Sequence, residues 1–181
     1  REKEERTFSA ADRIVAEVKN RTQAAGKIIL FGHSAGGQFV HRWALLGGKK
    51  NVDVIAVANS GWFTMPDRDI DYPYGIKNVG ITDEELGEAF AKPVILFMGE
   101  KDVERKLPFR DTPEADAQGM NRMERCMNYF RQCKAKAEEL RVPFRWKLET
   151  VEGAAHQGVK MAEGAAAYIF GKSSEDGNRR V

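Results

Sequence analysis

The chain has 181 residues and a mass of 20.3 kDa, which is enough for one domain with a sizeable core and too little for two ordinary ones. Its 29 Lys and Arg residues nearly balance 27 Asp and Glu residues, and 42% of the chain is hydrophobic, so neither a disordered chain nor a nucleic-acid binder is indicated. No apolar run approaches the roughly 18 to 20 residues that cross a bilayer, so we expect a globular protein without a membrane span.

The first part of the chain is predicted to alternate helix and strand. Ser9 begins a capping box for a helix whose apolar residues recur at helical spacing until Gly26. Residues 27–31 form an almost continuous apolar run, as in a parallel strand that is covered on both faces. A second helix follows from Ala35 and ends at the glycines of residues 47–48.

Two further buried strands are predicted at residues 52–58 and 93–98, each a continuous apolar run bounded by turn residues. An irregular insertion lies between them. Its residues 59–81 are interrupted by prolines and glycines, and Thr82 then caps a short helix. The insertion has the size of a small lid, which we place at about residues 61–92.

The last part of the chain is predicted to hold a long amphipathic helix over residues 113–140, with Met120, Met123 and Met127 in its apolar stripe. The two cysteines lie on this helix about 10 Å apart, beyond the roughly 7 Å reach of a disulfide, so they cannot bridge each other. Apolar and charged residues alternate over residues 144–148, as in a strand with one wet face near a sheet edge. A helix closes the chain.

Strands separated by helices imply parallel pairing. We therefore predict an α/β fold, a three-layer domain in which a parallel or mostly parallel sheet has helices on both faces. A single domain should span residues 1–171, followed by a polar C-terminal tail at residues 172–181.

The segment Gly32-His33-Ser34-Ala35-Gly36-Gly37 matches the pattern G-x-S-x-G between a predicted strand and a predicted helix. There the pattern is typical of a nucleophile elbow, a strained turn that exposes the hydroxyl of Ser34. The glycines two residues before and after Ser34 should remove Cβ atoms that would collide with neighbouring elements. The N–H of Ala35, at the helix N-terminus, is a candidate oxyanion donor. The alternative is a small-residue turn in which Ser34 only caps the helix.

A serine nucleophile needs a base, and the chain contains three histidines. The side chain of His33 diverges from that of the adjacent Ser34 and is expected to pack locally. His41 lies about 10 Å along the helix from Ser34 and is interpreted as structural. His156 lies in a small-residue loop after the last strand, at the sheet edge that also holds Ser34, so it is the candidate base.

An acidic residue is needed to orient the imidazole and fix its tautomer. Asp102 follows the strand at residues 93–98 and fits the chain order serine, acid, histidine. Glu100 is the runner-up. Aspartates of the insertion are less favoured, because a lid loop holds a carboxylate less rigidly than a strand end does; they are Asp67, Asp69 and Asp71.

Through GHSAGG at residues 32–37, GEKD at 99–102 and GAAH at 153–156, the sequence resembles the α/β-hydrolase superfamily over nearly its whole length. Within that superfamily it looks most like bacterial esterases related to polyhydroxybutyrate depolymerases, partly because of Ser60-Gly61-Trp62 and Pro73-Tyr74-Gly75 in the insertion.

The resemblance implies roles for individual residues. Ser34 would be the nucleophile, His156 the general base and acid, and Asp102 its orienting residue. Ala35 would supply an oxyanion donor. Neither a metal nor an organic cofactor is implied.

The sequence departs from this family in its first half. We count four parallel strands, fewer than the family sheet has, and no HGGG-like segment that would supply a second oxyanion donor precedes the elbow. The chain also begins with Arg1 rather than Met. We therefore expect the C-terminal half of an α/β-hydrolase fold within a longer parent. The strand at residues 27–31 would then have an open edge, which should pair with a missing N-terminal segment or another chain.

Side chains of the insertion are candidates for binding an acyl or polymer chain, with lid packing as the alternative: Trp62, Phe63, Met65, Tyr72 and Tyr74. The predicted substrate-binding residues are Trp62 and Tyr74, together with His33. Basic residues after Asp102 are interpreted as a solvated face rather than a site for a carboxylate or phosphate; they are Arg105, Lys106, Arg110, Arg122 and Arg125.

The leading functional hypothesis is a serine hydrolase that cleaves a small-molecule or polymeric ester through an acyl-enzyme. Amide or thioester cleavage would use the same side chains. The alternative is a binding or scaffold protein that keeps the fold with an incomplete oxyanion hole and no turnover.

Overall fold

The computed structural model of the chain describes residues 7–22, 26–47, 52–106 and 108–177. Its centre is a parallel four-stranded sheet of order β1-β2-β3-β4. The strands are β1 (Ile29–His33), β2 (Val54–Ala58), β3 (Val94–Gly99) and β4 (Lys147–Val151). Since every neighbouring pair of strands is parallel, the predicted sheet type is confirmed.

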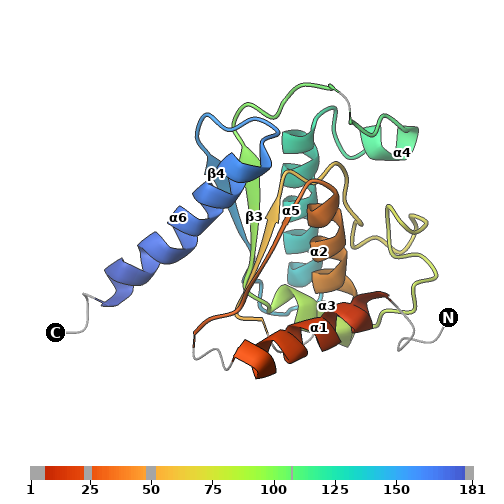
Figure 1. Ribbon diagram of the computed structural model, residues 1–181. Coiled ribbons are helices and arrows are strands. Elements are labelled where there is room, and N and C mark those ends of the chain that lie inside the picture. The colour runs from red at the N-terminus through yellow and green to blue at the C-terminus, as the bar shows by residue number, and fades with distance from the viewer. Residues whose placement is uncertain (1–6, 23–25, 48–51, 107, 178–181) are drawn as a thin grey trace.

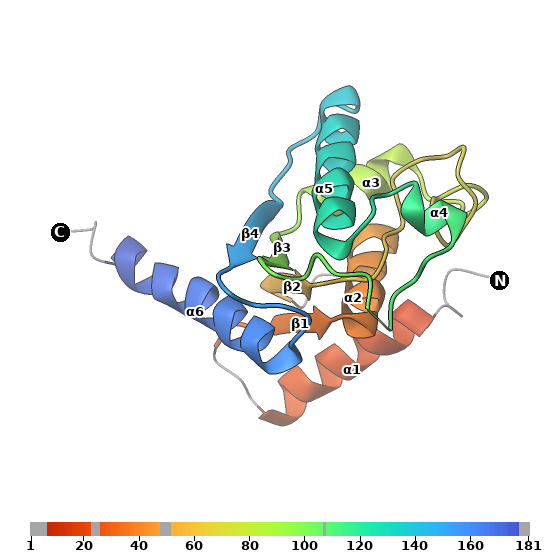
Figure 2. The same cartoon turned by 90° about the horizontal axis from the view of Figure 1, so that it is seen from above.

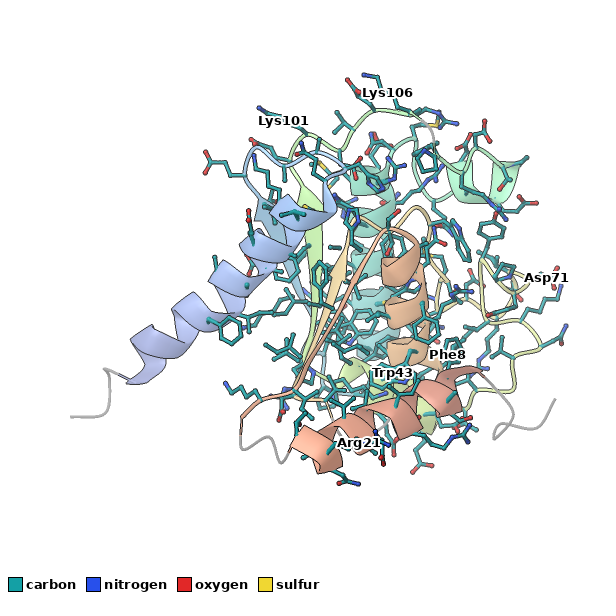
Figure 3. The ribbon with its side chains drawn as sticks, viewed as in Figure 1. Phe8, Arg21, Trp43, Asp71, Lys101 and Lys106 are labelled. Atoms are coloured by element: carbon teal, nitrogen blue, oxygen red, sulfur yellow. The ribbon has the colours of Figure 1, made fainter. Side chains whose placement is uncertain are left out.

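Helices cover both faces of this sheet, as predicted (Figure 1). One face carries α6 (Gly158–Gly177), and Figure 2 shows three helices on the opposite side. These are α2 (Ala35–Leu46), α3 (Asp83–Phe90) and α5 (Arg122–Glu139). Helix α1 (Thr7–Thr22) packs beside α2, where the indole N–H of Trp43 donates to Asp12 at 3.0 Å; Trp43 and Phe8 are labelled in Figure 3.

Alternation along the central strands separates the two faces. Ile55 and Val57 belong to the large core beneath α2, α3 and α5. Ala56 and Ala58 point the other way and pack with Met161 of α6. The small alanine side chains let α6 lie close to the sheet at the strand ends.

The sheet edges differ in exposure. β4 is an edge strand with an exposed and half-buried pattern, as the alternating sequence predicts. β1 forms the other edge, and in the described part of the chain only β2 pairs with it. Its pairing with a preceding segment or another chain stays a prediction. None of the described helices has the length and apolar character required to span a bilayer.

The predicted helix at residues 113–140 is wrong in one respect, because it is two helices. The short helix α4 (Pro113–Asp116) ends before Gly119, whose φ of 147° stops the helix, and the side chain of Asn121 then caps α5. Met120 falls at this break and is 55% exposed, so it is not part of the core. Cys126 and Cys133 are buried, and they form no disulfide with each other, as predicted.

Two other boundaries move. The last strand is β4 at Lys147–Val151 rather than residues 144–148, because Phe144 and Trp146 pack into the main core just before it. The polar tail is predicted to begin after residue 171, but helix α6 continues to Gly177. Residues 171–177 contain no proline that would end the helix, and their only glycines are Gly171 and Gly177.

The insertion after β2 is buried at its start, residues 61–66, and exposed at residues 68–72. Phe63 and Met65 are 0% and 2% exposed and belong to the main core, so they are not surfaces for a substrate. His41 ties the insertion to α2: its Nδ1 bonds the carbonyl of Gly37 at 3.0 Å, and its Nε2 accepts from the N–H of Thr64 at 3.0 Å. The structural role predicted for His41 is confirmed.

His41 should make the fold acid-sensitive. Burial lowers its pKa from 6.5 to about 3, and the nearby charge of Arg42 adds to this lowering, whereas the hydrogen bond to Gly37 opposes it. Between these two pH values the unfolded chain binds a proton that the folded chain does not, so stability falls as the pH decreases. From about pH 7 to about pH 5 this residue alone should cost about 2 kcal/mol.

Urea unfolding of the wild type and of His41→Gln at these two pH values tests this expectation. The glutamine amide keeps a donor and an acceptor but cannot be protonated. The free energy of unfolding of His41→Gln should therefore fall by about 2 kcal/mol less between the two pH values than that of the wild type does. Equal losses in both proteins would show that His41 does not titrate in this way.

Candidate active site

Three polar side chains meet at the carboxyl ends of the strands. These strand ends form the upper edge of the sheet in Figure 1. Ser34 follows β1, Asp102 follows β3, and His156 lies in the loop between β4 and α6. The hydroxyl of Ser34 lies 2.9 Å from Nε2 of His156, and Nδ1 of His156 lies 2.7 Å from Oδ2 of Asp102. A carboxylate only accepts, so the imidazole carries its proton on Nδ1, and Nε2 is free to accept from Ser34.

The turn that presents Ser34 is strained. Its φ and ψ are 55° and −117°, outside the regions that ordinary side chains prefer. The backbone holds it there: the N–H of Ser34 donates to Ala58 at 2.9 Å, and its carbonyl accepts from the N–H of Gln38 at 2.9 Å. The serine side chain makes no capping bond to α2. The alternative in which Ser34 merely caps the helix is therefore wrong.

The glycines around Ser34 are not equivalent. A Cβ on Gly32 would collide with the carbonyl of Gly36 and lie 2.7 Å from a methyl of Val40, and one on Gly37 would lie 2.6 Å from the hydroxyl of Ser60. A Cβ on Gly36 would meet no atom within 4 Å other than the neighbouring backbone of its own helix. The sequence-based expectation that Gly36 avoids a collision is thus wrong, and Gly37 takes that role.

Ala35 is the first residue of α2, where backbone N–H groups have no partner within the helix. The helix dipole adds partial positive charge at the same end. This arrangement favours an anionic oxygen beside Ser34, and the role of Ala35 as an oxyanion donor stays a prediction.

The loop that carries His156 is fastened at several points. The N–H of Gly153 donates to the carboxylate of Glu100 at 2.7 Å, and the N–H of Lys101 donates to the carbonyl of Ala154 at 2.8 Å. Glu100, the runner-up for the acidic role, is thus bonded to this loop, whereas the bond to the imidazole comes from Asp102.

Asn59 is a further contributor that the sequence analysis missed. It follows β2 with a φ of 45°, and its side chain accepts from the N–H of Gly99 at 2.8 Å and donates to the carbonyl of Ala155 at 3.0 Å. One side chain therefore joins the end of β3 to the loop of His156. An asparagine directly after a buried strand, where a positive φ is tolerated, was the available signal.

Asp102 is buried, with 3% of its surface exposed. Its second oxygen, Oδ1, accepts from Nη1 of Arg122 at 3.0 Å. Arg122 and Arg125 are buried in ion pairs with Asp102 and Asp116, so their assignment to a solvated face is wrong. The sequence periodicity did not indicate that these arginines are buried, because the stripe of methionines predicted that a different face of the helix is buried.

His33 packs against the imidazole of His156, with ring centroids 4.8 Å apart. Burial lowers the pKa of His33, and the charge of His156 adds to this effect. Nε2 of His33 is buried and has no hydrogen-bond partner among the described residues. His33 therefore forms one wall of the site, as local packing predicts, and its contact with substrate stays a prediction.

Trp62 and Tyr74 lie together in the insertion. Their rings are 5.0 Å apart, they are 7% and 8% exposed, and they form a small cluster with Ala115. Arg42 lies 5.1 Å from the Trp62 ring, and Nε of Arg110 donates to the hydroxyl of Tyr74 at 2.9 Å. The substrate contact of Trp62 and Tyr74 stays a prediction.

The aspartates of the insertion lie elsewhere. Asp69 and Asp71 are exposed, and Figure 3 shows Asp71 on the opposite side from Lys101, which precedes Asp102 in the chain. Among the residues that the structure describes, no group of three or more His, Cys, Asp or Glu side chains is placed to hold a metal ion.

No protein-family model matches the sequence, and no curated protein matches it either. Solved structures do match. Poly(aspartic acid) hydrolase-1 from Sphingomonas sp. KT-1 is 32% identical, with a TM-score of 0.86 over 94% of this chain and 65% of its own. LpqC, a poly(3-hydroxybutyrate) depolymerase from Bordetella parapertussis, is 30% identical, with a TM-score of 0.84 over 94% of this chain and 59% of its own.

The chain thus spans less than two thirds of the length of these two proteins. It has an α/β-hydrolase-like fold, as its resemblance to that superfamily implies.

Proposed function

We propose that this chain carries the catalytic triad of a serine hydrolase that cleaves carboxylic esters through an acyl-enzyme. The observation that supports this most strongly is the unbroken hydrogen-bonded series from Ser34 through His156 to Asp102, at 2.9 and 2.7 Å. The G-x-S-x-G pattern at the strained turn of a nucleophile elbow adds to it.

In the proposed reaction, Ser34 Oγ attacks the acyl carbon while its proton passes to Nε2 of His156. Asp102 stabilises the imidazolium that forms, because its carboxylate accepts from Nδ1. The oxyanion accepts a hydrogen bond from the N–H of Ala35. His156 then gives this proton to the leaving alcohol as the ester C–O bond breaks. It next takes a proton from water as the water attacks the acyl-enzyme, and returns it to Ser34 Oγ as the bond from Oγ to the acyl carbon breaks and the acid leaves.

The substrate class is proposed as a small-molecule or polymeric ester. The names of the two similar structures, a poly(aspartic acid) hydrolase and a poly(3-hydroxybutyrate) depolymerase, favour a polymer. In this proposal Trp62, Tyr74 and His33 contact the acyl or polymer chain, and the outer edge of β1 pairs with a preceding segment of a longer parent or with another chain.

Covalent labelling with a fluorophosphonate probe, read by intact mass, tests the nucleophile and the base together. The wild-type chain should gain one probe, and labelling should vanish in Ser34→Ala and in His156→Ala, because residues of a triad act as a unit. Ser60→Ala, which removes a neighbouring buried hydroxyl, should label like the wild type. A folded wild-type chain that takes no probe would favour the alternative of a non-catalytic binding or scaffold protein.

A further inference from the structure

Arg122 lies at a position where a positive charge is unfavourable. It is the first residue of α5, directly after the cap residue Asn121, where the helix dipole opposes a positive charge. Arg122 is also only 3% exposed, and a charge without a partner is costly to bury. Since both local effects oppose an arginine here, the interaction that stabilises it must come from the tertiary structure.

That interaction is with the acidic residue of the proposed triad. Nη1 of Arg122 donates to Oδ1 of Asp102 at 3.0 Å, and the two side chains are 3% and 4% exposed. The other oxygen of Asp102 accepts from His156. Each carboxylate oxygen thus has its own partner, so the carboxylate cannot rotate without breaking a charge-assisted hydrogen bond.

Arg122 itself is held in place from two further sides. Its Nη2 donates to the carbonyl of Pro108, and its guanidinium lies 5.0 Å from the ring of Phe109. Arg105 and Arg125 lie at 4.8 and 4.4 Å from the same ring, but both pair with Asp116. Three guanidinium groups therefore lie around the ring of Phe109, and among them it is the guanidinium of Arg122 that donates to Asp102.

We propose that Arg122 is a positioning residue for the reaction. It holds Oδ2 of Asp102 in line with Nδ1 of His156 and supplies the counter-charge of the buried carboxylate. This inference rests on the proposed function, because it gives Asp102 the orienting role in the triad.

The test measures two properties of Arg122→Gln, Arg122→Lys and Arg122→Ala. One is the rate of fluorophosphonate labelling at Ser34, and the other is the low-field proton resonance of the bond between His156 and Asp102. Glutamine and alanine should slow labelling roughly tenfold to 100-fold, by analogy with the range found when the hydrogen-bond partners behind metal-ligating residues are removed, and should shift or broaden the resonance. Lysine keeps the positive charge but lacks the planar guanidinium with its several fixed N–H donors. The labelling rate and the resonance of Arg122→Lys should therefore lie between those of the wild type and those of Arg122→Gln.

Rescue separates positioning from general damage to the fold. Guanidinium ion at low, non-denaturing concentration should raise the labelling rate of Arg122→Ala and leave the wild type unchanged, since it replaces the missing group. Two matched controls use the other arginines on Phe109. Arg105→Gln should keep both the rate and the resonance, and Arg125→Met should lower stability while keeping the resonance.

Two results would overturn the inference. One is a folded Arg122→Gln that labels as fast as the wild type with an unchanged resonance. The other, if glutamine prevents folding, is an Arg122→Lys protein with an unchanged resonance and no rescue of Arg122→Ala by guanidinium. A wild-type chain that takes no probe at Ser34 would instead contradict the proposed function, so the two failures are distinguishable.

Discussion

Asp102→Asn should lower the rate of ester hydrolysis by about 10⁴-fold, because it selects the wrong tautomer of His156. Nη1 of Arg122 donates to Oδ1 of Asp102, so the new amide should turn its carbonyl to Arg122 and its NH₂ group to His156. A donor facing Nδ1 drives the imidazole proton to Nε2. Nε2 then cannot accept from Ser34, which loses its base.

The same substitution should destabilise the fold by about 3 to 5 kcal/mol, since it leaves the guanidinium of Arg122 buried without a counter-charge. The double variant Asp102→Asn, Arg122→Gln should recover part of this loss. Urea unfolding measures stability, and single-turnover labelling or hydrolysis of an activated ester measures the rate.

Glu100→Gln is the matched control for Asp102→Asn. Glu100 holds the loop of His156 through the N–H of Gly153, so its amide variant should lose no more than about tenfold in rate. A loss as large as that of Asp102→Asn would make Glu100 the orienting acid and would overturn the proposed role of Asp102.

Gly32→Ala should be the most damaging single methyl group in the elbow. The added Cβ collides with the backbone carbonyl of Gly36, which cannot move without displacing α2 from β1. Overpacking of this kind costs about 3 kcal/mol at the upper end of its usual range. A displacement of Ser34 by about 1 Å should in addition slow labelling about 100-fold.

Gly36→Ala tests whether the collision is the cause. Its Cβ meets open space, and alanine favours the helix over glycine by about 0.5 to 1 kcal/mol, so this variant should unfold at an equal or higher urea concentration. If Gly36→Ala were as destabilised as Gly32→Ala, the motif would require both glycines for a reason other than the collision at Gly32.

Much of the fold could be predicted from the sequence because its signals are local. Continuous apolar runs mark β2 and β3, and the capping box of Thr82 with Glu85 marks the start of α3. The positions of Ser34, Asp102 and His156 also followed from a local rule, since residues after parallel strands meet at one edge of the sheet.

The hydrogen-bond partners of Asn59 and Arg122 could not be predicted in this way, although the place of Asn59 directly after a buried strand was a signal for its positive φ. Each acts through a partner far along the chain, Asn59 on Ala155 and Arg122 on Asp102, and spacing carries no information about such pairs. The break before α5 was missed because the predicted apolar stripe begins at Met120, directly after Gly119, so the helical period gave no sign that the backbone leaves the helix there.

The bonds around Asn59 have a mechanical consequence. The N–H of Ser34 donates to the carbonyl of Ala58, and Asn59 is the next residue in the chain. The side chain of Asn59 is hydrogen-bonded to both Gly99 and Ala155. The end of β2 therefore lies at the junction of the segments that carry the serine, the acid and the histidine. Thermal motion should move these segments together as one rigid body, so the two distances that define the site should fluctuate less than the surrounding loops do.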